Sequence, residues 1–124
     1  MTPPKISPVA GREAVKAVIS TSSINDVDRS TLATAVRYLL QQFEQAHPGH
    51  TVEVRVPPFG AVQAVEGPRH TRGTPANVVE LAPAEWVRLA TGSVSWAELV
   101  GQGKLSASGI RSDISVLFPV IVVR

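Results

Sequence analysis

The sequence has no cysteine, two tryptophans, three phenylalanines, one tyrosine and no long apolar run. The absence of cysteine excludes disulfides, thiolate catalysis and cysteine-ligated metal sites. No segment approaches the roughly 18 apolar residues of a membrane span, and no apolar stretch follows a basic start in the manner of a secretory signal. We therefore expect a cytoplasmic protein without stable membrane insertion, with a core made mainly of Val, Leu, Ile and Ala.

Signals for catalysis and for nucleic-acid binding are also missing. The formal net charge of +2 is dispersed, whereas nucleic-acid binding needs a basic stripe with stacking aromatics. Neither a Gly-x-Ser-x-Gly elbow nor a Gly-x-x-x-x-Gly-Lys phosphate loop occurs. The histidines are His47, His50 and His70, and the first two lack the acidic or thiol companions of a zinc site. We expect no enzyme, no metal site and no nucleic-acid partner.

The length of 124 residues and the apolar content of 44% predict one domain with a substantial core. Residues 1–10 contain Pro3, Pro4 and Pro8, which predict a flexible, extended lead-in. The single domain would then span residues 11–124.

Apolar spacing predicts two helices in the first half of the chain. A short one covers residues 12–20. A longer one begins at a cap provided by Asp28 or Ser30 and ends at residues 47–49. Its apolar face predicts that it lies across a sheet, and the face consists of Leu32, Val36, Leu39, Leu40 and Phe43.

Alternating apolar residues predict the strands. Residues 51–56 alternate cleanly, residues 57–60 form a turn, and residues 61–66 return. Residues 77–81 follow as a third strand, which gives an antiparallel meander, and residues 104–108 form a later strand.

The remaining segments predict three short helices. Residues 83–91 begin with a proline and end at Gly92. Ser95 and Glu98 have the spacing of a capping box, which starts the second helix. Ser112 would cap a last helix that ends at Pro119.

An ordered series of these features resembles a known family. It runs from Asn77 through a helix ending in Thr91-Gly92 and a capped short helix to Gly103-Lys104-Leu105 and Gly109. This series covers about a third of the chain. It resembles the sterol carrier protein superfamily, and within it the short stand-alone actinobacterial members.

The resemblance implies an α/β (α+β) fold: a mostly antiparallel sheet of about five strands with helices packed on one face. It also implies an apolar tunnel between these layers that accepts acyl chains, sterols or similar molecules, and a carrier that uses no cofactor. The predicted lining of this cavity consists of Leu39, Phe43, Trp86, Leu89, Leu99, Leu117 and Phe118.

The roles of three features stay open at this point. Trp86 and Trp96 either line a cavity or anchor an ordinary core, and Trp96 fits the core better. Residues 117–121 form either a lid over a tunnel mouth or a plainly packed helix. The apolar tail, residues 120–123, must pack against its own domain or against a partner, and that partner would be a second copy of the chain or another protein.

A basic loop gives the best polar candidate. Arg69, His70 and Arg72 lie among glycines and prolines, where guanidinium and backbone N–H groups can hold a carboxylate or phosphate head group. The alternative is a solvated hairpin loop in which an arginine pairs with Glu66 or Glu80.

Three functions follow from these features. The first is a non-catalytic carrier for an apolar or amphipathic small molecule, such as a lipid, an acyl chain or a sterol-like molecule. The second is an interaction module that uses loop 67–75 for a protein or an anionic metabolite and has a closed cavity. A third, weaker hypothesis is an enzyme that acts through Arg69 and His70.

Overall fold

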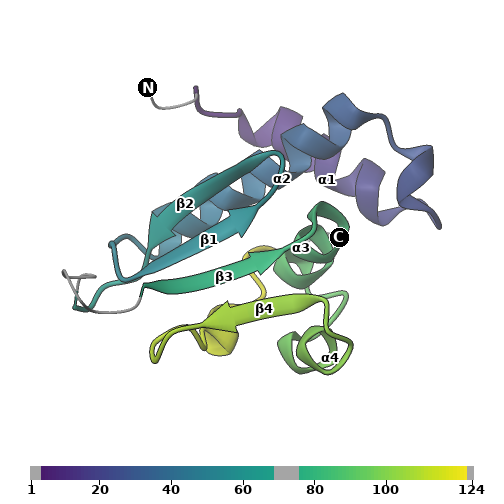
Figure 1. Ribbon diagram of the computed structural model, residues 1–124. Coiled ribbons are helices and arrows are strands. Elements are labelled where there is room, and N and C mark those ends of the chain that lie inside the picture. The colour runs from purple at the N-terminus through teal and green to yellow at the C-terminus, as the bar shows by residue number, and fades with distance from the viewer. Residues whose placement is uncertain (1–3, 69–75, 123–124) are drawn as a thin grey trace.

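The computed structural model describes residues 4–68 and 76–122, which form helices packed against a four-stranded mixed sheet (Figure 1). The α-helices are α1 (Pro8–Ile19), α2 (Arg29–Ala46), α3 (Pro83–Thr91) and α4 (Trp96–Gly101). The strands are β1 (Val52–Val56), β2 (Gly60–Ala64), β3 (Asn77–Leu81) and β4 (Leu105–Ser108). Two 3-10 turns cover Ile24–Asp26 and Ser115–Leu117.

The sheet corrects two expectations. Its strand order is β2-β1-β3-β4, so the described residues form four strands and not five. The predicted meander is wrong because β3 pairs with β1 in parallel, whereas β1–β2 and β3–β4 are antiparallel. Val52, Val54 and Val56 are fully buried in β1 because the helices cover that face of the sheet. Alternation in the sequence identifies such a strand but does not encode its partners.

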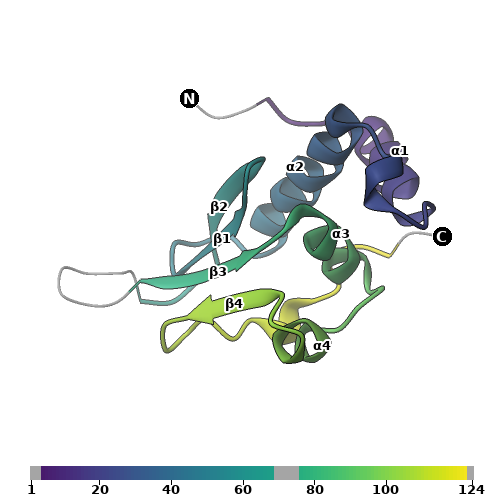
Figure 2. The ribbon, with the colours of Figure 1, turned by 45° about the vertical axis from the view of Figure 1, so that its right-hand side comes forward.

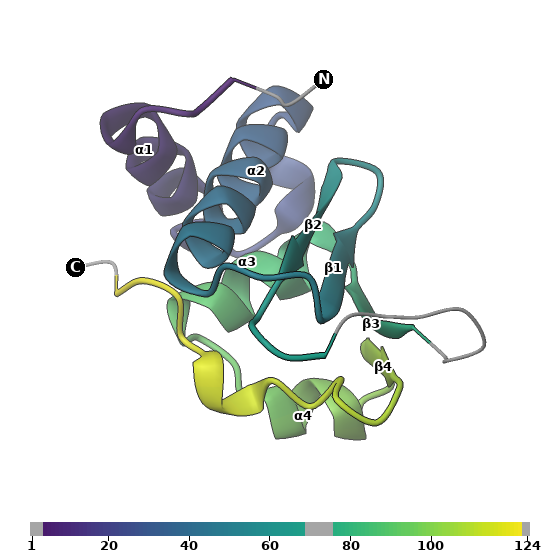
Figure 3. The same ribbon diagram turned by 90° about the vertical axis from the view of Figure 1, so that its left-hand side faces the viewer.

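The helices lie on one side of the sheet (Figure 3). The predicted apolar face of α2 is confirmed: Val36, Leu39, Leu40 and Phe43 are at most 2% exposed, and Leu32 is half-buried against the same core. Asp28 is its cap, since its carboxylate accepts a hydrogen bond from the Thr31 backbone N–H at 2.8 Å. That hydrogen bond, followed by one from the Thr31 hydroxyl, holds the pKa of Asp28 below its ordinary value.

The first helix begins earlier than the sequence predicts. Ser7 caps α1 by accepting from the Ala10 backbone N–H at 3.2 Å, and Pro8 occupies the first helical position, which suits proline. Residues 8–10 therefore belong to the helix and not to an extended lead-in. Helix α1 runs alongside α2 (Figure 2), and the buried ring of Tyr38 lies directly against Gly11.

Asn77 ties three segments together at one end of the sheet. Its side-chain N–H donates to the Thr51 carbonyl at 3.0 Å, and its side-chain oxygen accepts from the Arg111 backbone N–H at 2.9 Å. Gly109 has a φ of 102° and lies so close to Asn77 that a side chain there would collide with it. Asn77 and Gly109, the two ends of the series that resembles the sterol carrier family, are therefore in contact with each other.

The end of α3 and the start of α4 follow the predictions, but the C-terminal helix does not form. Gly92 ends α3 with a φ of 85°, and the Ser95–Glu98 capping box is present. The predicted last helix is reduced to Ser115–Leu117, because the Ser112 hydroxyl donates to the Gly109 carbonyl at 2.8 Å and caps no helix. The few residues left before Pro119 are too short to nucleate an α-helix.

Candidate functional site

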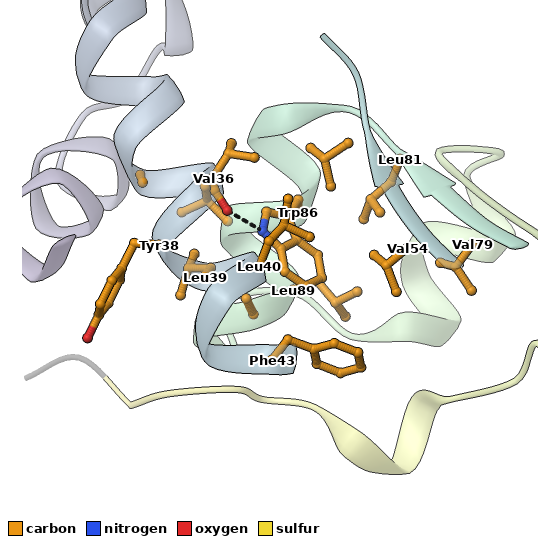
Figure 4. Close-up of a cluster of buried hydrophobic side chains, with 14 of the residues drawn as sticks. Val36, Tyr38, Leu39, Leu40, Phe43, Val54, Val79, Leu81, Trp86 and Leu89 are labelled. Atoms are coloured by element: carbon orange, nitrogen blue, oxygen red, sulfur yellow. Dashed lines mark hydrogen bonds between the residues drawn. The ribbon is translucent and has the colours of Figure 1, made fainter. Parts of the chain in front are cut away.

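A cluster of aromatic rings fills the space between α2, α3 and the C-terminal segment. Trp86 lies at its centre on α3, with no exposed surface, and its indole N–H donates to the Val36 carbonyl at 3.2 Å (Figure 4). The Trp86 and Phe43 rings meet edge to face, with centroids 6.1 Å apart. Because its apolar body and its one polar group both have partners, Trp86 is a core anchor in this structure.

Phe118 joins this cluster from the C-terminal segment. Its ring stacks on Phe43 at 5.5 Å, meets Trp86 edge to face at 5.9 Å, and lies 6.0 Å from the ring of Trp96. Phe118 is nevertheless only half-buried. It therefore lies at the boundary between the closed interior and the surface.

An open groove of about 330 Å³ lies on the outer side of Phe118. We call it the Trp96 groove. Its lining comes from the end of α3, the start of α4 and the C-terminal segment, and consists of Leu89, Gly92, Ser93, Val94, Ser95, Trp96, Glu98, Ser115, Phe118 and Pro119. Its volume is at the lower end of the roughly 300–1,000 Å³ typical of small-molecule sites.

The C-terminal segment, residues 114–122, covers the aromatic cluster from the side of the Trp96 groove. Figure 4 shows it running past Phe43. The backbone N–H groups of Val120 and Ile121 donate to a single acceptor, the Ala90 carbonyl, at 2.7 and 3.1 Å. Val120 and Ile121 are also half-buried against the core. Val120 and Ile121 of the apolar tail therefore pack on their own domain, whereas Val122 is 66% exposed.

The structure places the predicted cavity residues in two groups. Leu39, Phe43, Trp86, Leu89 and Leu99 are at most 1% exposed, whereas Leu117 and Phe118 are half-buried. Phe43, Trp86 and Phe118 come together, and Leu89 and Phe118 reach the Trp96 groove. Leu99 instead lines a separate, more polar groove between the end of α1, α3 and α4.

Sequence reasoning missed Trp96 as a groove residue. It favoured a core position, whereas the ring is half-buried and lines the groove. The sequence carried no local signal for this position, because it depends on where α4 lies relative to the C-terminal segment.

A second groove of about 450 Å³ also escaped the sequence analysis. It lies between α2 and the edge strand β2, and we call it the α2–β2 groove. Its lining consists of Lys5, Arg37, Leu40, Gln41, Glu44, Gln45, His50, Phe59, Gly60, Ala61, Val62 and Gln63. The sequence feature that could have indicated this groove is Phe59, an apolar residue in the hairpin turn that leads into β2.

The predicted head-group contacts Arg69, His70 and Arg72 lie outside the described residues. Within residues 4–68 and 76–122, no group of three or more His, Asp or Glu side chains is arranged to hold a metal ion. Glu98 is the one carboxylate that lines the Trp96 groove, and its side chain accepts from the Ser95 backbone N–H at 3.3 Å as part of the helix cap. The helices in the described part of the chain are too short or too polar to cross a membrane.

Comparison with known proteins identifies the family of the chain. A family model described as bacterial SCP ortholog matches residues 28–120, from the cap of α2 to the C-terminal segment. A search of curated proteins returns no matching relative. Since the matched range covers most of the chain and includes the four strands of the described residues, the chain belongs to this bacterial family of sterol-carrier-like proteins.

Proposed function

We propose that this protein is a non-catalytic carrier that binds the apolar part of a small lipid-like molecule in the Trp96 groove. Family membership supports a carrier role in general. The observation that carries the choice of site is the position of Phe118, which contacts the buried rings of Phe43 and Trp86 and also lines the groove. An acyl chain or sterol-like ligand would take the place of the Phe118 ring and bind against the aromatic cluster.

Two features favour displacement of this side chain. The segment that carries it adopts a 3-10 turn and extended backbone, so it moves without breaking a helix or a strand. The segment is tied to α3 by the backbone N–H groups of Val120 and Ile121, which both donate to the Ala90 carbonyl. A ligand of similar apolar area would replace the contacts that the Phe118 ring gives up, so the exchange costs little.

The lining of the Trp96 groove favours binding without chemistry. Its titratable residue, Glu98, is engaged in the cap of α4. Its hydroxyl groups come from Ser93, Ser95 and Ser115, and no histidine lines the groove to activate them. A head-group contact by Arg69, His70 and Arg72 is part of the proposal, since an amphipathic ligand would need a place for its polar end.

We expect Phe118→Ala to strengthen the binding of decanol by about tenfold to a hundredfold. The ligand no longer has to displace a partly buried ring, and burial of a phenylalanine is worth about 1.5–3 kcal/mol. The substitution should also lower the free energy of unfolding by about 1–3 kcal/mol, because apolar contacts are lost. Isothermal titration with decanol and urea unfolding measure the two effects.

Val116→Ala is the matched control, because Val116 lies in the same segment but is 89% exposed. It should change neither decanol affinity nor stability. If Phe118→Ala binds decanol no better than the unmodified protein does, the ligand does not use this site.

A further inference from the structure

We propose that the α2–β2 groove is a second, separate binding site, specific for small amphipathic anions that carry a carboxylate or a similar group on an apolar body. The groove lies between the helix layer and the free edge of the sheet, where β2 is the outermost strand. It shares no lining residue with the Trp96 groove. The argument rests on its floor, its rim and the way the rim is held.

The floor of the groove is apolar. Leu40 of α2 is 2% exposed, and Val62 and Phe59 are half-buried. In the β1–β2 register, Val62 is opposite the buried Val54, so its side chain points to the helix side of the sheet. These side chains form a surface that a short alkyl chain or a ring can cover.

Gly60 keeps this floor open. A Cβ atom built at Gly60 would lie 3.4 Å from a methyl carbon of Leu40, so any side chain there would extend into the space beside Leu40. The backbone of Gly60 does not have the positive φ that favours glycine. The missing side chain therefore provides space, which a bound molecule can use.

The rim of the groove is cationic. Its charged lining residues are Lys5, Arg37 and Glu44, and His50 lies beside them. Arg37 uses its Nε–H to donate to the Phe59 carbonyl at 3.0 Å, which leaves its two terminal nitrogens for an anion. Arg29 adds positive charge nearby, with its guanidinium 5.2 Å from the centre of the Phe59 ring.

Lys5 is held at this rim by its neighbours. The Gln41 side chain donates to the Pro4 carbonyl at 3.2 Å and accepts from the Ile6 backbone N–H at 2.9 Å. These two hydrogen bonds fix the chain on both sides of Lys5 against α2. Neither Lys5 nor Arg37 forms an ion pair with another described residue. A carboxylate over the groove would therefore meet an ammonium carried by a fixed backbone and a guanidinium held by the Phe59 carbonyl.

Decanoate is the probe for this site, and its uncharged analogue decanol is the comparison. Site-resolved ¹H–¹⁵N spectra report on each groove separately: the amides of Leu40 and Val62 for the α2–β2 groove, and the amide and indole of Trp96 for the other. We expect decanoate to shift the Leu40 and Val62 signals in a saturable way, with a Kd at least tenfold lower than decanol shows at the same signals.

The double variant Lys5→Gln and Arg37→Gln should raise the Kd of decanoate at these signals by about tenfold or more and leave that of decanol unchanged. The matched control is Lys16→Gln with Arg55→Gln, which removes the same charge from exposed residues outside the groove. It should change the Kd by less than twofold. Higher ionic strength should weaken decanoate binding alone.

Gly60→Val tests the floor independently of charge, since its methyl groups would occupy the space beside Leu40 and abolish the shifts at Val62. The proposal is overturned if decanoate leaves Leu40 and Val62 unshifted, if both ligands bind there equally, or if the control variant weakens binding as much as the rim variant. If the ligands shift no signal of Trp96 while they shift those of Leu40 and Val62, the result contradicts the proposed carrier site and not this one.

Discussion

Replacement of Trp86 by alanine should lower the free energy of unfolding by about 3–5 kcal/mol, the range for removal of a large buried aromatic side chain. Trp86 has no exposed surface, contacts Phe43 and Phe118, and its indole N–H donates to the Val36 carbonyl. The substitution leaves a cavity and also leaves the Val36 carbonyl without this donor. Since small domains are stable by about 5–15 kcal/mol, a large part of the stability is lost.

Urea unfolding followed by circular dichroism measures this loss. Trp96→Ala is the control, because Trp96 is only half-buried at the edge of the same cluster and should cost less than half as much. Trp86→Phe separates packing from hydrogen bonding, since it keeps a ring and removes the donor. Equal losses for Trp86→Ala and Trp96→Ala would show that Trp86 is not the centre of the core.

Replacement of Gly11 by alanine should destabilise the protein although alanine is the better helix former. A Cβ atom at Gly11 would overlap the Tyr38 ring, which is itself only 2% exposed and has no room to move. Overpacking of this kind costs about 3 kcal/mol, and the higher helix propensity of alanine offsets about 1 kcal/mol. We expect a net loss of about 2 kcal/mol, measured by urea unfolding.

Gly101→Ala is the matched control for this prediction. Gly101 also lies in a helix, but a Cβ atom there meets nothing within 4 Å. The substitution should leave stability unchanged or raise it slightly. If Gly11→Ala were also neutral, α1 would not pack against α2 as closely as the structure has it.

The sequence predicted the local elements well where a pattern of spacing or a cap defined them. The apolar face of α2, the alternation of β1, the Gly92 end of α3 and the Ser95–Glu98 cap are all confirmed. Each depends on residues within a few positions of one another. A short stretch of sequence therefore contains all the information that such a prediction needs.

The predictions that failed depend on contacts between distant residues. The parallel pairing of β3 with β1 depends on which strand occupies the second edge of β1, and alternation is the same for either arrangement. The C-terminal helix failed because Ser112 bonds back to Gly109, whose place is fixed by Asn77. The half-exposed position of Trp96 depends on where α4 sits over the C-terminal segment, which no local pattern encodes.

The candidate site was predicted only in part, because it also depends on contacts between residues that are distant in the sequence. Burial of Phe43, Trp86 and Leu89 follows from apolar spacing, and these residues do reach the aromatic cluster or its groove. Openings between layers depend on the absence of side chains, as at Gly60, and on segments fixed from afar, as at Lys5. The α2–β2 groove therefore had no counterpart in the sequence analysis.

The most direct test of the carrier proposal is quenching of tryptophan fluorescence by a bromine-labelled ligand, 11-bromoundecanol, because bromine quenches only at contact distances. The two tryptophans are Trp86 and Trp96, so Trp96→Phe isolates the buried one. We predict saturable quenching of both, with no quenching by undecanol. Binding of the ligand by equilibrium dialysis without quenching of either tryptophan would contradict the proposed site, and no binding at all would contradict the carrier function.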